Sequence, residues 1–201
     1  REDKELSRTI ANNKNVFVSM NFDMRDNQTP PELPDSLKVK LDNQSKIINY
    51  DQFTFTNCRL ILDEIFKNTS NIGIINFSRD DDGISRRSPI FIKYRDDFYP
   101  YLAFKLAYYY FNKHENLNID KFVINKENQL IFGKNKIQLD DNGFMLINWY
   151  GPDRTYQYIP AWKVVHSFDA IKRGKKPLLP ANYFKDKIVF IGTTATALFD
   201  I

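Results

Sequence analysis

The chain has 201 residues, of which 42% are hydrophobic and 27% are charged, and this balance is typical of a folded domain with a substantial core. Basic residues number 29 and acidic residues 25, so the net charge of +4 is too diffuse to indicate a nucleic-acid partner. No run approaches the roughly 18 apolar residues that a membrane span needs. The single Cys58 excludes an internal disulfide and a multi-thiolate metal centre.

The first half of the chain alternates helical and strand patterns around a long polar stretch. Leu6 and Ile10 recur at helical spacing among charged residues, and β-branched and aromatic residues follow from Asn15. Three prolines then mark a polar stretch that we expect to cross the surface, up to about residue 56. The predicted elements are a helix over 2–13, a strand over 15–22, a short helix over 59–67 and a strand over 71–77.

The second half begins with an acidic turn and ends with an apolar strand. Asn, Asp and Gly separate the short strand patterns between residues 121 and 150, which predicts consecutive hairpins. The run KIVFIG over 187–192 is apolar after its lysine, as buried strands of parallel sheets are. The predicted elements are a turn over 79–83, a strand over 88–94, a helix over 100–112, a helix from Pro160 to Gly174 and a strand over 187–192.

These elements predict an α/β fold, in which helices flank a mixed sheet and the hairpins around 121–150 form a β-meander insert. We expect residues 1–201 to form a single domain. Because the chain begins with Arg1 rather than methionine, we also expect it to be a truncated piece of a longer protein.

The residues that usually carry catalysis do not assemble into a motif. The glycines build neither a GxGxxG nor a Walker loop, and Cys58 has no evident histidine partner. His114 and His166 lie more than fifty residues apart, without Cys or Glu at ligand spacing. The acidic run 80–82 before Gly83 lacks the alternating ligands of a calcium loop. We therefore predict no catalytic residues, no metal and no cofactor.

The arginines that follow the acidic turn are candidate ligand-binding residues. Arg86 and Arg87 alternate across the predicted strand, so one should face inward and need a carboxylate, for which Asp82 is the nearest candidate. The same arginine could instead bind an anionic ligand through two parallel hydrogen bonds. The structural ion pair is the favoured interpretation.

Aromatic residues surround a polar pair near the end of the hairpin region. Trp149 and three tyrosines flank Asp153 and Arg154, an arrangement that sugar-binding sites and protein interfaces use. Packing of Trp149 in the core is the favoured alternative. We interpret the later basic cluster as a solvated helix end rather than a surface for membranes or phosphate groups. It consists of Lys172, Arg173, Lys175, Lys176, Lys185 and Lys187.

The end of the apolar strand supplies the last candidates. Thr193 and Thr194 follow Gly192, where ligands of α/β sheets tend to bind, and Asp200 comes shortly after. The alternative is that one of the two threonines caps a helix.

Three blocks of sequence together indicate a protein family more specifically than any single block does. The first joins GIIN (73–76) to DDDGI (80–84), Arg86 and Arg87, and the second joins INWYGP (147–152) to YIP (158–160). The third is FKDKIVFIGTTA (184–195) with Asp200. In order and spacing these blocks resemble the CHASE2 family, the extracytoplasmic sensory domains of bacterial receptors. The resemblance covers nearly the whole chain. Because the family normally carries a β-α-β segment before these blocks, we expect the chain to be the middle and C-terminal part of the domain.

The resemblance implies a module that senses a ligand or condition outside the cytoplasmic membrane and has no catalytic residues of its own. In the family, such domains regulate cytoplasmic adenylate or guanylate cyclases, histidine kinases or diguanylate cyclases. The implied partners are an unknown small-molecule or envelope ligand and the flanking transmembrane helices of the full-length protein. Whether the chain forms a homodimer is left open, and we expect no nucleic-acid partner.

Two other classes of function stay open. One is a small α/β enzyme, a hydrolase or nucleotide binder, and the other is a cell-envelope carbohydrate-binding module that uses the aromatic segment. The sequence favours the sensor, because two histidines and one cysteine do not supply a nucleophile with its base.

Overall fold

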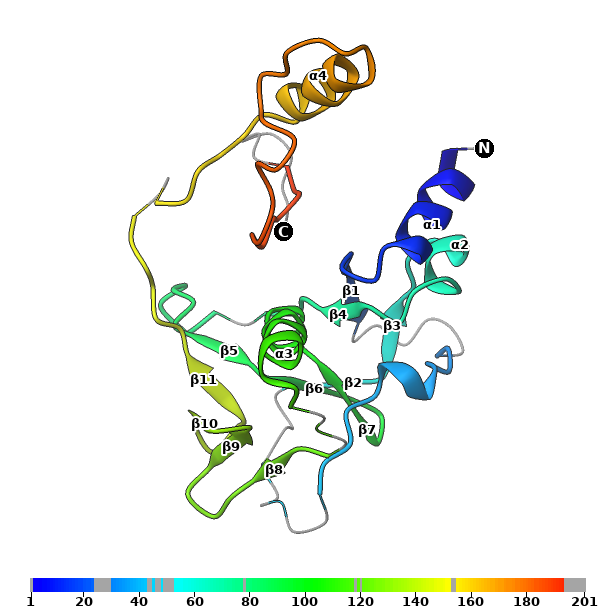
Figure 1. Ribbon diagram of the computed structural model, residues 1–201. Helices are drawn as coiled ribbons and strands as arrows, with labels where there is room; N and C mark the ends of the chain where they lie inside the picture. Colours follow the sequence, from blue (N-terminus) through cyan, green and yellow to red (C-terminus); the bar gives the residue numbers. More distant parts are fainter. Residues whose placement is uncertain are drawn as a thin grey trace. The chain divides into compact units, whose positions relative to one another are not determined.

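The computed structural model describes residues 2–23, 30–42, 45, 48, 53–77, 79–117, 119, 121–152 and 155–193. Contacts divide the chain into two compact units, residues 1–148 and 149–201, which we call unit 1 and unit 2. Among the described elements, unit 1 holds every strand and three α-helices, and unit 2 holds helix α4 (Figure 1). The predicted α/β class is confirmed.

Most elements of unit 1 lie close to the predicted ones, but the strands at 54–55, 57–59 and 97–100 were not predicted. Its helices are α1 (Glu2–Asn12), α2 (Asp63–Phe66) and α3 (Leu102–Glu115), with a short 3-10 helix η1 (Asp35–Leu37). Its strands are β1 (Val18–Asp23), β2 (Thr54–Phe55), β3 (Asn57–Arg59), β4 (Ile72–Ile74), β5 (Arg87–Pro89), β6 (Phe91–Tyr94), β7 (Asp97–Pro100), β8 (Val123–Ile124), β9 (Gln129–Phe132), β10 (Asn135–Gln138) and β11 (Phe144–Leu146).

The strands of the described ranges form four small sheets. Strand β1 lies between β3, which runs antiparallel to it, and β4, which runs parallel. Strand β6 lies between β2 and β7, β9 lies between β8 and β10, and β11 pairs with β5. Along β1, Met20 and Phe22 are buried while Ser19 and Asn21 are exposed, so one face of its sheet packs on the core and the other faces outward.

One core cluster lies under the sheet of β1. The ring of Phe22 lies 5.9, 4.9 and 5.4 Å from the rings of Phe55, Tyr94 and Tyr99. Leu33 and Leu37 also belong to this cluster, at 7 and 4% exposure. The expectation that the proline-containing stretch only crosses the surface is therefore wrong, because its few apolar residues are spaced so that they reach the core.

A second core cluster joins helix α3 to the hairpins after it. Phe104 of α3 lies within ring contact of Phe91, Phe122 and Phe132, at 5.2, 5.4 and 5.7 Å between centroids. Phe91 is 0% exposed. The predicted hairpins around 121–150 are confirmed, and they pack into this core rather than standing apart from it.

Helix α3 begins very close to strand β4. A Cβ atom on Gly73 would lie 2.5 Å from the Cα of Leu102, so only glycine fits there. Ile74 forms a parallel bridge with Tyr101, and the ammonium group of Lys105 donates to the carbonyl of Ile72 at 3.1 Å. The start of α3 thus covers the edge of β4 that faces away from β1.

Unit 2 contains helix α4 (Ala161–Lys172), which confirms the helix predicted from Pro160 to Gly174. Gly174 has a φ of 66°, the left-handed conformation that glycine adopts readily after a helix. None of the helices in the described ranges combines the length and the apolarity that a membrane crossing requires.

The strand predicted over 187–192 does not form. Ile188, Val189, Phe190 and Ile191 are 56, 48, 76 and 98% exposed, and none of the described strands pairs with them. Apolar composition favours a strand, but a strand is stable only when a neighbour accepts its hydrogen bonds. The predictions of a strand and of its burial are both wrong for this structure.

Candidate functional site

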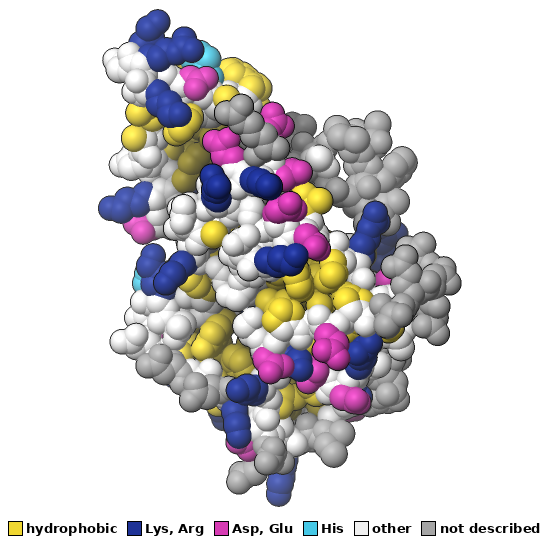
Figure 2. Space-filling model, turned by 90° about the vertical axis from the view of Figure 1, so that its right-hand side faces the viewer, with side chains coloured by type: hydrophobic (Ala, Val, Ile, Leu, Met, Phe, Trp, Pro, Cys, Tyr) yellow, Lys and Arg dark blue, Asp and Glu magenta, His cyan; other side chains and the backbone are white. Residues whose placement is uncertain are grey.

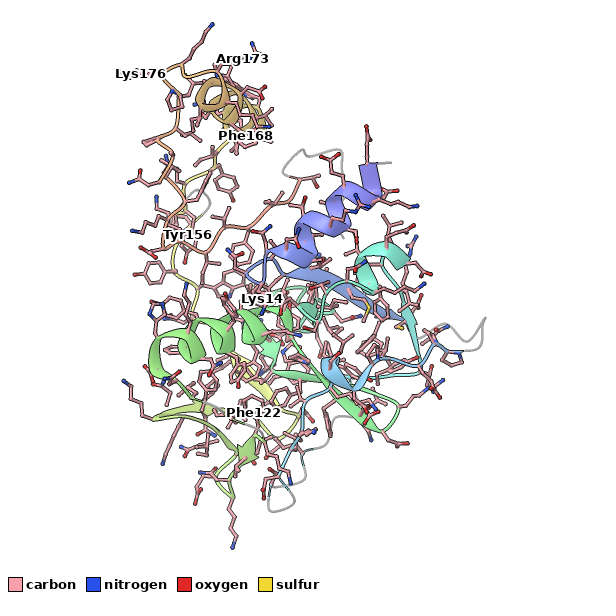
Figure 3. The ribbon with its side chains drawn as sticks, turned by 45° about the vertical axis from the view of Figure 1, so that its right-hand side comes forward. Lys14, Phe122, Tyr156, Phe168, Arg173 and Lys176 are labelled. Atoms are coloured by element: carbon pink, nitrogen blue, oxygen red, sulfur yellow. The ribbon has the colours of Figure 1, made fainter. Side chains whose placement is uncertain are left out.

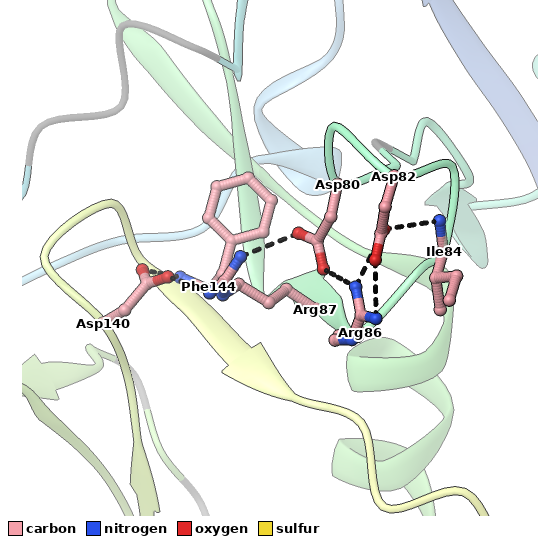
Figure 4. Close-up of polar contacts among 7 residues, drawn as sticks. All are labelled: Asp80, Asp82, Ile84, Arg86, Arg87, Asp140 and Phe144. Carbon is pink, nitrogen blue, oxygen red and sulfur yellow. Dashed lines mark hydrogen bonds and ion pairs between the residues drawn. The ribbon is translucent and has the colours of Figure 1, made fainter.

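An ion-pair network joins the acidic turn after residue 79 to strand β5 (Figure 4). The guanidinium of Arg86 donates to both carboxylate oxygens of Asp82, with Nη1–Oδ1 at 2.9 Å and Nη2–Oδ2 at 2.7 Å. The same carboxylate accepts the backbone N–H of Ile84 at 3.1 Å. Arg86 also donates to Asp80, with Nη1–Oδ2 at 3.1 Å. The predicted pairing of Asp82 with an arginine is confirmed.

The neighbouring Arg87 extends this network to a second turn. Its Nη1 lies 2.7 Å from Oδ1 of Asp80, and its Nε lies 3.6 Å from Oδ2 of Asp140. Asp140 in turn accepts the backbone N–H of Phe144 at 3.0 Å, at the start of β11. Because β11 also pairs with β5, the arginines connect two turns that flank one small sheet.

The network lies at the surface rather than in the core. The side chains of Arg86, Asp82 and Arg87 are 45, 52 and 48% exposed, so the expectation of an inward arginine is wrong. The hydrogen bonds from Arg86 lower the pKa of Asp82 to about 2, and the carboxylates raise the pKa of Arg86. Because about half of each arginine side chain is exposed, the guanidinium groups are accessible to dissolved anions. Exposed ion pairs stabilise a fold only weakly.

The aromatic segment before α4 lies in solvent. Trp149 is 66% exposed, so the expectation that it packs in the core is wrong. The rings of Tyr150 and Tyr156 stack at 6.2 Å with an interplanar angle of 26°, and Figure 3 labels Tyr156 on this segment. The candidate residues Asp153 and Arg154 lie outside the described residues.

The candidates that follow the 187–192 segment are only partly described. Thr193 is exposed and is the last residue that the structure describes. Thr194 and Asp200 lie outside the described residues. The structure therefore tests neither the helix cap nor the ligand site predicted there.

A shallow hollow that the sequence did not suggest lies on the outward face of the sheet β3–β1–β4. Its volume is about 200 Å³, below the roughly 300–1,000 Å³ of sites for drug-sized ligands. Arg59 lies opposite Asn21 in the strand register and has no ion pair with another described residue. The sequence pattern that could have indicated this outward face is the alternation of polar and apolar residues along β1. The residues that line the hollow are Ser19, Met20, Asn21, Arg59, Leu60, Ile61 and Ile75.

The basic cluster lies at the end of helix α4, in the upper part of Figures 2 and 3. Lys172, Arg173, Lys175 and Lys176 are all exposed, as the predicted solvated helix end requires. Unit 2 contains 8 of the 29 basic and 4 of the 25 acidic residues. Unit 1 therefore holds 21 of each, and the net charge of +4 lies in unit 2.

Cys58 and His114, the residues of unit 1 with catalytic potential, have structural surroundings. Burial raises the pKa of the Cys58 thiol, which keeps it protonated and unreactive at neutral pH. His114 contacts the ring of Tyr110 at 4.4 Å. In the described part of the chain, no group of three or more His, Cys, Asp or Glu side chains is placed to hold a metal ion.

The fold and these surfaces define a mixed α/β protein whose candidate sites are exposed charged and aromatic groups. The sequence profile of the CHASE2 domain matches residues 1–201, and the chain belongs to the CHASE2 family. The CHASE2 domain is an extracytoplasmic sensory domain. Searches among curated proteins and among solved structures found no match.

Proposed function

We propose that this chain is the sensory part of a bacterial transmembrane receptor that regulates a cytoplasmic adenylate or guanylate cyclase or a histidine kinase. The observation that carries the proposal is the family match over residues 1–201. The chain catalyses no reaction itself. It binds a small-molecule or envelope ligand outside the membrane, and the flanking transmembrane helices of the full-length protein carry the change across.

The proposed ligand site is the network around Arg86 and Arg87, and the proposed ligand is an anion with a carboxylate, phosphate or sulfate group. About half of each arginine side chain is exposed, at 45 and 48%. A guanidinium presents a planar fork of N–H groups that matches such oxyanions. The ligand would compete with Asp140 for the donors of Arg87.

The proposed signal is the release of one turn from the other. The contact between Arg87 and Asp140, at 3.6 Å, is the longest ion pair of the network and therefore the easiest to exchange. When an anion takes its place, the acidic turn keeps its own pair between Asp82 and Arg86 but loses its link to the turn before β11. A ligand shifts an equilibrium between two arrangements only through such a difference in contacts.

Thermal unfolding of the chain in phosphate, sulfate and succinate tests the site. We expect at least one of these anions to stabilise the chain, and Arg87→Gln to abolish that effect. Arg8→Gln is the matched control, because Arg8 is exposed on α1 and has no ion pair with another described residue. In the full-length receptor, Arg87→Gln should remove the stimulated output while Arg8→Gln leaves it intact. Unchanged stimulation in an Arg86→Gln, Arg87→Gln double variant would contradict the proposed site.

The exposed aromatic residues favour a carbohydrate of the cell envelope as a second candidate ligand. Trp149, Tyr150, Tyr156 and Tyr158 are 66, 76, 70 and 60% exposed, and aromatic rings bind the apolar faces of sugars. Co-sedimentation with peptidoglycan should be lost in Tyr150→Ala and kept in Phe77→Ala, which removes an aromatic ring of unit 1 that is 49% exposed. Equal sedimentation of both variants would contradict this candidate.

A further inference from the structure

The hollow on the outward face of the sheet β3–β1–β4 brings a guanidinium group next to two polar side chains. Asn21 lies opposite Arg59 in the strand register, and Ser19 lies two residues before Asn21, so the three side chains share one face. All three residues are exposed, and their side chains form no hydrogen bond or ion pair with another described residue. Their polar groups can therefore bind a molecule that enters the hollow.

Apolar side chains border the same hollow on both sides of β1. Leu60 and Ile61 follow directly after β3, and Ile75 follows directly after β4. Leu60 is 36% exposed, and Ile61 and Ile75 are half-buried. A ligand with a hydrocarbon part removes this apolar surface from water, which an inorganic phosphate or sulfate ion does not. The hollow therefore favours an organic ligand.

The charge of the hollow selects the polar groups of that ligand. Among the described residues that line it, Arg59 carries the only charge, and a guanidinium matches the two oxygens of a carboxylate. Because none of these residues is acidic, the ammonium group of an amino acid would have no partner of opposite charge. The hydroxyl of Ser19 and the amide of Asn21 can instead bond an uncharged hydroxyl group.

We infer that this hollow binds a small 2-hydroxy carboxylate with a short hydrocarbon chain. The volume of about 200 Å³ equals the share of about seven water molecules, so only a small molecule fits. Arg59 binds the carboxylate. Asn21 is the direct cross-strand neighbour of Arg59, so the hydroxyl that it bonds lies close to the carboxylate in the ligand. The apolar side chains on both sides contact the hydrocarbon chain.

This second site is separate from the proposed anion site. The residues that line the hollow include neither Arg86 nor Arg87, and they belong to the sheet of β1 rather than to the pair of β5 and β11. The inference goes beyond the proposed function, because it would stand even if no anion bound at Arg87.

Calorimetric titration of the 201-residue chain with three compounds of one carbon skeleton tests the ligand class. The compounds are 2-hydroxyisovalerate, isovalerate, which lacks the hydroxyl, and valine, which carries an ammonium group in its place. We expect 2-hydroxyisovalerate to bind, isovalerate to bind about threefold or more weakly, and valine about tenfold or more weakly. No binding of 2-hydroxyisovalerate, or equal binding of 2-hydroxyisovalerate and valine, would overturn the inference.

Substitution of the arginine tests the position of the site. Arg59→Gln should raise the dissociation constant of 2-hydroxyisovalerate roughly tenfold or more, because it removes the charge that holds the carboxylate. Arg8→Gln is the matched control and should leave the dissociation constant unchanged. If Arg87→Gln abolished binding and Arg59→Gln did not, the compound would bind at the proposed anion site, and the inference would be wrong.

A variant that fills the hollow tests the site without a change of charge. Ser19→Leu places an apolar side chain among the lining residues and should weaken the binding of 2-hydroxyisovalerate roughly tenfold or more, although Arg59 is kept. Thr56→Leu is its control, because Thr56 is exposed beside β3 but does not line the hollow. Urea unfolding confirms that each variant is folded before titration. Equal affinity of the two folded leucine variants would overturn the inference.

Discussion

Lys105 makes the stability of unit 1 depend on pH in an unusual direction. Its ammonium group donates to the carbonyls of Ser70 and Ile72, at 2.5 and 3.1 Å, and no acidic side chain among the described residues pairs with it. Burial lowers its pKa from 10.5 to about 8. In the unfolded chain the lysine keeps its ordinary pKa, so between pH 8 and 10.5 the unfolded state binds more protons than the folded state. The free energy of unfolding therefore rises with pH in this window.

The size of the rise follows from the change in pKa. One pKa unit corresponds to about 1.4 kcal/mol, so two units between pH 8 and 10 give about 2–3 kcal/mol. Above pH 10 a second effect opposes it. Burial raises the pKa of both Tyr94 and Tyr99 to about 12, so their ionisation in the unfolded chain lowers stability as the pH increases further. The measurement is therefore best confined to pH 7.5–10.

Urea unfolding of Lys105→Met at several pH values isolates the lysine. Relative to this variant, the natural chain should gain about 2–3 kcal/mol from pH 8 to 10, because the variant retains every other titrating group. Lys113→Met is the control, since Lys113 lies exposed on the same helix and should leave the pH profile parallel to that of the natural chain. Parallel profiles for the natural chain and Lys105→Met would refute the argument.

Two further predictions concern packing and charge. Gly73→Ala should lower the free energy of unfolding by about 1–3 kcal/mol in urea, because the new Cβ would lie 2.5 Å from the Cα of Leu102. Gly192→Ala, which has open space around it, should have no comparable effect. Asp82→Asn should lower the melting temperature at pH 6 but not at pH 2. The pKa of Asp82 is about 2 against an ordinary 3.8, so its contribution is present above pH 3.8 and is lost as the pH falls towards 2. If Asp82→Asn lowered the melting temperature equally at both pH values, the charge of the Asp82 carboxylate would not be the cause.

Elements whose stability is local could be predicted from the sequence. Helix α4 has Pro160 before it and Gly174 after it, and the hairpins of 121–150 have turn residues between their strands. The pair of Asp82 and Arg86 lies four residues apart, so its partners could be named in advance.

Contacts between distant residues could not be predicted in this way. Asp140 joins Arg87 from fifty-three positions along the chain, and nothing near either residue indicates the other. The hollow beside Arg59 depends on the pairing of β1 with β3, which no local pattern specifies. The same limit explains the error at Trp149, because the identity of an aromatic residue does not say whether a surface lies opposite it.

The close approach of α3 to β4 also limits how the parallel sheet can grow. Ile72 and Ile74 present their backbone groups on the edge that faces away from β1, and Lys105 and the bridge to Tyr101 occupy that edge. An incoming strand would have to displace a helix and a buried ammonium group before it formed its first hydrogen bond. Natural sheets resist aggregation by covering or charging their edges, and this edge has both protections. Strand exchange between copies of this protein should therefore leave β4 intact.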